Sequence, residues 1–149
     1  MPAVKIFIDT NVLLYTVDET EFTKGPLAQQ WLLSLSQHGA GTTNLQVLNE
    51  TTSLLLRRRR DVHPTDVFAI IDRFGRFGIQ PLGSKDISLA RTLHLHHRFS
   101  WWDCLLLASA IDLSCTHFLS EDLQDGQKIQ GLTIVDPFAH SPEQILIPR

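Results

Sequence analysis

Long apolar runs are absent from this chain of 149 residues. The longest, such as residues 104–108, are far shorter than the roughly 20 residues that a membrane-spanning helix needs. The pattern of a secretion signal, a basic segment followed by an apolar core, is also missing from the N-terminal region. These absences predict a cytoplasmic protein with no membrane partner.

Cysteine is scarce as well. The two cysteines, Cys104 and Cys115, fall within one helical pattern, and eleven residues of helix separate them by roughly 16 Å. Two thiols that far apart cannot form a disulfide. The sequence contains no Cys-x-x-Cys and no His-Glu-x-x-His spacing, which excludes the common structural zinc sites and the zinc metalloproteases.

The chain has no excess of basic residues: its formal net charge is −3. It is therefore not a nucleic-acid-binding polycation as a whole, and any contact with nucleic acid must come from a local patch. An apolar fraction of 43% is ordinary for a folded domain, and no repeat, linker or low-complexity segment divides the chain. We expect one domain over residues 1–149, with a core at about 4–138 and a short C-terminal tail.

Residues 4–8 are mostly β-branched or aromatic and end abruptly at Asp9, Thr10 and Asn11. This run predicts a short buried strand of a parallel sheet. An acid at the carboxyl end of such a strand is placed for chemistry, but Asp also favours the N-cap of a following helix. Asp9 is therefore either a cap or a ligand.

The rest of the chain alternates between helical and strand patterns. This alternation predicts an α/β fold, a mainly parallel sheet covered by helices on both faces. Capping-box spacing at Thr43-x-x-Gln46 and Ser100-x-x-Asp103 marks two of the helix starts. We expect helices at about 12–17, 24–39, 42–60, 64–74, 84–97 and 100–113, strands at 79–82, 116–119 and 131–135, and no periodicity in the tail.

Acids follow two of the predicted strands, at Asp9 and Asp122, and the topology brings both to one edge of the sheet. Glu50 lies on a helix at the edge of its apolar stripe, and Asp103 opens the most apolar helix. Asp103 either completes a helix cap or faces the same edge. Carboxylates that gather in this way repel one another, so their usual partner is a hard divalent cation, Mg²⁺ or Mn²⁺.

Four consecutive arginines, Arg57, Arg58, Arg59 and Arg60, end one helix. They either form a solvated helix end, favoured by the helix dipole, or bind the phosphates of RNA or an acidic protein partner.

The three histidines at 94, 96 and 97 scatter around a helix, so we expect an interaction face or partial burial and not a metal site. Of the two neighbouring tryptophans, Trp102 is expected in the core, with stacking on an unpaired base as the alternative for Trp101 or Trp102.

Four stretches together resemble the motifs of the PIN-domain nucleases, in order and spacing over roughly residues 4–138. Asp-Thr-Asn alone would be a weak signal, but four acids in this order are specific. The stretches are Phe7-Ile8-Asp9-Thr10-Asn11, Leu48-Asn49-Glu50, Trp102-Asp103-Cys104-Leu105-Leu106 and residues 119–126 with Ser120, Asp122 and Asp125.

The resemblance implies a three-layer α/β/α sandwich with a small, mainly parallel sheet and metal-dependent hydrolysis of RNA phosphodiester bonds. It further implies a VapC-type toxin, paired with an antitoxin and forming a homodimer. In family terms, the residues Asp9, Glu50, Asp103 and Asp122 carry the Mg²⁺ or Mn²⁺ site. Asn11 and Ser120 support it, and Asp125 ligates, positions water or only caps the turn before Gly126.

Two other functions stay open. Phosphatases of the haloacid dehalogenase type also place an acid after the first strand, but they use Asp-x-Asp, and Asn11 stands at the second acidic position here. A domain that retains its acids could instead act as a noncatalytic module that binds RNA or protein. The sequence does not decide the RNA target or the number of metal ions.

Overall fold

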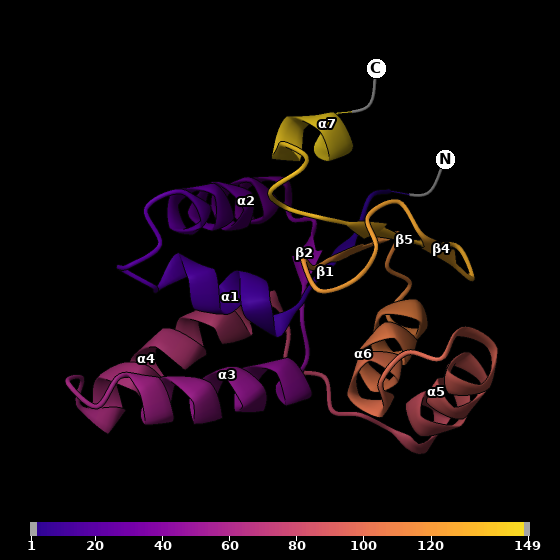
Figure 1. Cartoon of the computed structure of the whole chain (residues 1–149), viewed down its shortest axis with the longest axis horizontal. Coiled ribbons are helices and arrows are strands. Elements are labelled where there is room, and N and C mark those ends of the chain that lie inside the picture. Colours follow the sequence, from indigo (N-terminus) through magenta and orange to yellow (C-terminus); the bar gives the residue numbers. More distant parts are fainter. Residues whose placement is uncertain (1–2, 148–149) are drawn as a thin grey trace.

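The computed structural model describes residues 3–147. In this range the chain forms one five-stranded sheet, seven α-helices and one 3₁₀ turn (Figure 1). The elements in order are β1 Ile6–Ile8, α1 Thr10–Thr16, α2 Lys24–His38, β2 Gly41–Thr42, α3 Leu45–Arg58, α4 Pro64–Phe74, η1 Gly75–Phe77, α5 Ser84–His97, α6 Trp101–Asp112, β3 His117–Leu119, β4 Lys128–Ile129, β5 Leu132–Val135 and α7 Pro142–Leu146.

The sheet has the strand order β2-β1-β3-β5-β4, and only β4 runs antiparallel to its neighbour. In the central pair, Ile8 is in register with Leu119. The residues that follow, Asp9 and Ser120, therefore leave the sheet at the same edge. The parallel register thus fixes where the polar side chains of two distant segments meet.

Helices pack on both sides of the strands: in Figure 1, α2 and α7 lie above the sheet, and α3 to α6 lie below it. Strand β1, next to the central strand β3, is completely buried, and the ring of Phe7 stacks on Phe118 of β3 at 5.3 Å between centroids. The predicted α/β architecture with a mainly parallel sheet is confirmed. No helix within residues 3–147 is long and apolar enough to cross a membrane.

Several local expectations were wrong. Asn44, and not Thr43, caps α3, because the Thr43 hydroxyl donates to the Ile8 carbonyl instead. The strand expected at 79–82 is only a single bridge between Asn44 and Gln80. The tail contains the short helix α7, which is too brief to show a period. Strands β2 and β4, of two residues each, were not predicted for the same reason.

Both cysteines are buried and free. Cys104 lies in α6, whereas Cys115 lies beyond the end of that helix at Asp112. The single continuous helix assumed for the pair is therefore wrong, although the absence of a disulfide is as expected.

Candidate active site

Asp9 connects β1 to α1 and is both cap and pocket residue. Its Oδ1 accepts a hydrogen bond from the backbone N–H of Thr10 at 2.7 Å, as an N-cap side chain does. Its Oδ2 accepts from the Ser120 hydroxyl at 2.8 Å, and the side chain is only 5% exposed. The two roles weighed from the sequence are thus compatible, because each carboxylate oxygen faces a different neighbour.

Burial raises the pKa of Asp9 to about 7. The hydrogen bonds from Ser120 and Thr10 oppose this effect, whereas the negative charges of Asp103 and Asp122 add to it. A nearby positive charge stabilises the ionised form of a carboxyl group that is buried beside other acids. Among the described residues, none of the ion pairs involves Asp9.

Asn11, two residues into this motif, joins the two strand ends. Its side-chain amide nitrogen lies 3.2 Å from Asp9 Oδ2, 3.0 Å from Ser120 Oγ and 3.0 Å from Asp122 Oδ2. The backbone N–H of Asp122 also donates to Ser120 Oγ, at 3.2 Å. The uncharged side chains of Asn11 and Ser120 therefore hold Asp9 and Asp122 side by side.

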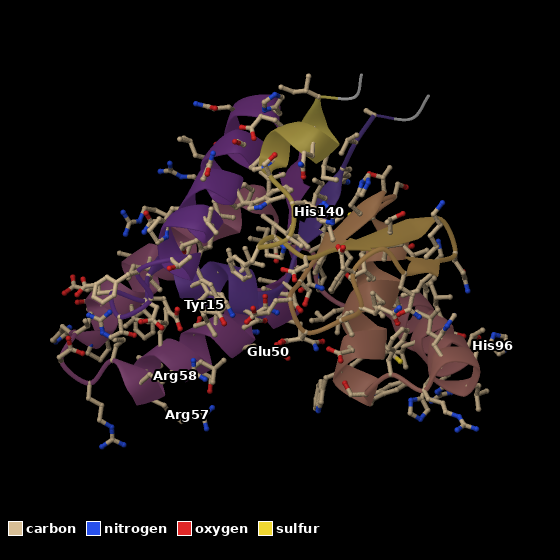
Figure 2. All side chains as sticks on the ribbon, turned by 45° about the horizontal axis from the view of Figure 1, so that its top comes forward. Tyr15, Glu50, Arg57, Arg58, His96 and His140 are labelled. Carbon is tan, nitrogen blue, oxygen red and sulfur yellow. The ribbon has the colours of Figure 1, made fainter. Side chains whose placement is uncertain are left out.

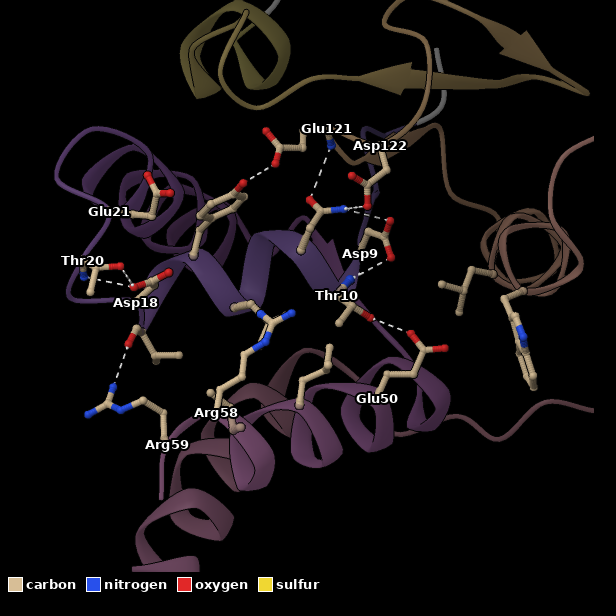
Figure 3. Close-up of a pocket in the computed structure, with 18 of the residues that line it drawn as sticks. Asp9, Thr10, Asp18, Thr20, Glu21, Glu50, Arg58, Arg59, Glu121 and Asp122 are labelled. Carbon is tan, nitrogen blue, oxygen red and sulfur yellow. Dashed lines mark hydrogen bonds between the residues drawn. The ribbon is translucent and has the colours of Figure 1, made fainter. Parts of the chain in front are cut away.

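The other two predicted acids come from helices. Glu50, on α3, accepts from the hydroxyl of Thr10 at 3.0 Å, as Figure 3 shows. Asp103 lies in the first turn of α6, which Ser100 caps by accepting the Asp103 backbone N–H at 3.2 Å. Burial, together with the charge of Asp122, raises the pKa of Asp103.

All four acids line one open pocket of about 710 Å³. They reach it from four segments that are far apart in the sequence: the end of β1, α3, α6 and the turn after β3. The pocket is therefore a product of the fold, and its wall carries acids that repel one another.

The four arginines separate into different environments. Arg59 forms a two-pronged ion pair with Asp61 at 3.1 and 3.2 Å and donates to the Val17 carbonyl, so it ties the ends of α3 and α1 together. Arg58 extends from α3 toward α1, between Asp18 and Glu50 (Figure 3), and lines the pocket, as Arg59 also does. Arg57 and Arg60 are exposed and do not line it.

Asp125 does not line the pocket. Its oxygens accept from the backbone N–H of Asp136 at 2.9 Å and from His140 Nε2 at 2.8 Å, so it fixes the chain after β5. One of these contacts holds the backbone of Asp136, the other holds the side chain of His140, and neither caps the turn before Gly126. His96 lies on the outer side of α5, far from Arg57 and Arg58 in Figure 2, and His94 bonds the Phe99 carbonyl.

Trp102 was expected in the core, and that expectation was wrong: 62% of it is exposed, and it lines the acidic pocket. The apolar helix that it opens is buried only from Cys104 onward. Two residues near the site were not predicted from the sequence: Tyr15, whose hydroxyl donates to Glu121, and Lys24, which pairs with Glu121 at 2.9 Å. No local pattern marks these residues.

The donor set suits a hard divalent cation. Several carboxylates surround the pocket, and within the described residues none of Asp9, Glu50, Asp103 and Asp122 has a basic partner within ion-pair distance. Within residues 3–147, however, no three Asp, Glu, His or Cys side chains are close enough together to hold one ion. Mg²⁺ keeps several waters and needs only one or two carboxylates, so such a spread arrangement fits Mg²⁺ better than a cation that protein ligands enclose.

Comparison with known proteins identifies the family and the fold. The model of the PIN domain matches residues 6–124. No curated protein matches by sequence. Three similar solved structures are a toxin-antitoxin complex from Klebsiella pneumoniae (TM-score 0.67, 16% identity, 89% of this chain and 98% of that chain), Mycobacterium tuberculosis VapC20, a sarcin-ricin loop cleaving toxin (0.60, 20%, 76% and 87%), and VapBC2 from Rickettsia felis bound to a promoter DNA fragment (0.60, 14%, 88% and 97%).

At these identities the solved structures show a shared fold, in agreement with the strand order and helix layers described above. The family match is independent of them and covers most of the chain, including the four pocket acids. The chain belongs to the PIN domain family.

Proposed function

We propose that this protein is a ribonuclease that hydrolyses RNA phosphodiester bonds at the acidic pocket with Mg²⁺ or Mn²⁺. One observation carries the proposal: Asp9, Glu50, Asp103 and Asp122 come from four segments to line one pocket in which Asp9 is buried beside other acids. Membership of the PIN family and the likeness to a toxin that cleaves the sarcin-ricin loop support it.

The side chains of the pocket have different proposed roles. Asp9 and Asp103 would be the nearest ligands of the cation, and Glu50 and Asp122 complete or tune the site. A bound divalent cation lowers the pKa of a coordinated water and stabilises charge on the phosphate. Asn11 and Ser120 orient Asp9 and Asp122, and Thr10 orients Glu50. Arg58 is placed to bind a phosphate oxygen of the substrate.

We also propose that the protein is the toxin of a toxin-antitoxin pair, that it is a homodimer and that residues 1–149 act as one domain. The similar structures from Klebsiella pneumoniae and Rickettsia felis support an antitoxin partner. The surface proposed for that partner is the apolar and arginine-rich face of the helices before Pro64. Size-exclusion chromatography with light scattering tests the dimer.

The test of the enzyme is cleavage of a mixed RNA pool by the purified protein with Mg²⁺, with Mn²⁺ and with EDTA. Asp9→Asn and Asp103→Asn each remove one pocket charge with little change in shape. Asp72→Asn is the matched control, because Asp72 is an exposed acid on α4 that does not line the pocket. We expect cleavage only with the metal ions, retention of activity in Asp72→Asn and a loss of at least 100-fold in the other two, the order seen when an electrostatic group of a catalytic site is removed.

Equal cleavage by the wild type and both pocket variants would mean that a contaminating nuclease is responsible. No cleavage of the pool, with RNA still bound, would favour the noncatalytic binding module. Release of phosphate from small phosphate monoesters without cleavage of RNA would favour a phosphatase.

A further inference from the structure

An open groove of about 570 Å³ adjoins the acidic pocket. Pro81, Leu82, Leu45 and Trp102 form its apolar walls, and Gln46, Asn49 and Ser53 of α3 add uncharged polar groups. Glu50 and Trp102 line both the groove and the acidic pocket. A single ligand can therefore occupy both, with a charged group beside the acids and an apolar group in the groove.

Trp102 forms the boundary between the two. Its side chain is 62% exposed, whereas the neighbouring Trp101 is 37% exposed and lines neither space. Trp102 precedes Asp103 directly, so its position is tied to that of a pocket acid through the first turn of α6. A large aromatic side chain exposed to water contributes little to the core, and Trp102 lies outside the buried part of α6, which begins at Cys104.

The chemistry of the groove favours a nucleobase. A base has an apolar face that stacks on an indole and a polar edge that forms hydrogen bonds with amides and hydroxyls. Gln46, Asn49 and Ser53 recur at spacings of three and four on α3 and thus share one side of that helix. A base also lies next to a phosphate in every nucleotide, which matches the adjacency of groove and acidic pocket.

We propose that the groove is a subsite for an unpaired base of the RNA strand, with the base stacked on the indole of Trp102. This inference rests on the proposed ribonuclease function and adds one contact to it, between the indole of Trp102 and a base of the substrate. A base within a duplex is already stacked and paired, so it cannot present a free face to Trp102.

Binding of RNA to a protein that does not cleave it tests this subsite. We would use Asp9→Asn as the parent, with Mg²⁺, and measure the anisotropy of a labelled mixed-sequence single-stranded RNA decamer. Adding Trp102→Ala should weaken binding by about 5- to 150-fold, the range that corresponds to stacking of one base. Adding Trp102→Phe should restore most of the affinity, and Trp101→Ala, the control in the same turn, should change it less than twofold.

Two further readouts separate stacking from a general loss of structure. Binding of a fully paired RNA of the same length should not respond to Trp102→Ala. The decamer should quench tryptophan emission in the parent and much less in Trp102→Phe, because Trp31 is buried and Trp101 lies outside the groove. A lower Tm of Trp102→Ala with equal loss of binding to both RNAs would overturn the proposal.

The outcomes also distinguish the subsite from the ribonuclease. If the wild type cleaves RNA and Trp102→Ala leaves decamer affinity unchanged, the subsite is wrong and the ribonuclease stands. If the wild type neither cleaves nor binds RNA, both fail together. If Trp102→Ala converts a dimer into a monomer and leaves decamer affinity unchanged, the groove is an interface between two copies and the subsite is again wrong.

Discussion

At the scale of single residues, neighbours on the same helix have different tasks. Arg58 and the adjacent Arg59 both line the acidic pocket, but the guanidinium group of Arg59 is already held by Asp61 and the Val17 carbonyl. Within the described residues Arg58 forms no ion pair, and neither Arg57 nor Arg60 lines the pocket. Of the four arginines, Arg58 is therefore the one with a direct path to a phosphate beside the acids.

Arg58→Ala should raise the KM for RNA about tenfold with little change in Tm, because a charge-assisted hydrogen bond to phosphate contributes roughly 1.5 kcal/mol. Arg57→Ala is the matched control and should change KM less than twofold. Steady-state kinetics on one defined RNA measures both. Equal effects of the two substitutions would show that the arginines act as a general basic patch.

Asp86 gives a second prediction at this scale, on pH. The residue is 4% exposed, its Oδ2 accepts from the Gly83 backbone N–H at 3.0 Å, and its Oδ1 has no hydrogen-bond partner. Burial, with the nearby charge of Asp112, raises the pKa of Asp86 above its ordinary value of 3.8. A raised pKa means that the folded state holds a proton that the unfolded state has released, so this contribution to stability is lost as the pH rises from 3.8 through the raised pKa.

Asp86→Asn removes this pH dependence and keeps an acceptor for the Gly83 N–H. The variant should exceed the wild type in free energy of unfolding by about 1–2 kcal/mol at pH 8, since it removes a buried negative charge beside Asp112, and by less at pH 4. Urea unfolding at the two pH values measures the difference. A constant difference at both would contradict a raised pKa.

At the scale of elements, the start of α3 decides where Glu50 lies. Asn44 caps the helix by accepting the Val47 N–H at 2.9 Å, and its amide donates to Ser109 of α6 at 2.9 Å. One buried side chain thus joins the helices that carry Glu50 and Asp103.

Asn44→Ala should lower the free energy of unfolding by about 2–4 kcal/mol, since the cap is lost and the buried Ser109 hydroxyl loses its partner. Asn49→Ala, on the exposed side of the same helix, should change it by less than about 0.5 kcal/mol. Chemical denaturation of both variants provides the measurement. A cost below 1 kcal/mol for Asn44→Ala would mean that α3 is positioned by apolar packing alone.

At the scale of the whole molecule, the pocket exists only in the folded state, because its acids come from four distant segments. A divalent cation that binds there should therefore stabilise the folded protein against unfolding. At 100 times its dissociation constant the gain is about 2.7 kcal/mol, which for a domain of this size raises Tm by roughly 5–10 °C.

We expect Mn²⁺ to raise the Tm of the wild type, EDTA to reverse the effect and Asp9→Asn to show a smaller rise. Because the pKa of Asp9 is about 7 and metal ligands must lose their protons, the rise should be larger at pH 8 than at pH 6. Thermal unfolding scans under these conditions measure the rise in Tm. An equal rise in wild type and Asp9→Asn would place the cation elsewhere.

The sequence alone determined the architecture and the order of the motifs, since alternating periodicities and an acid at the end of a buried strand are local signals. It also predicted that Asp9 and Asp122 follow strands, which a parallel sheet brings to one edge. The family resemblance drawn from those motifs is confirmed by the match over residues 6–124. The catalytic roles of the acids stay predictions.

Only the tertiary structure decided which side chains face the pocket. Packing between elements distant in sequence places Arg58 at the pocket without an ion-pair partner among the described residues, while Arg59 beside it pairs with Asp61. The same packing leaves Trp102 exposed and directs Asp125 toward His140. Such choices depend on the orientation of helices relative to the sheet, which a periodic pattern does not encode. The chain specifies its acids locally, but the surroundings that would make them a site arise from long-range contacts.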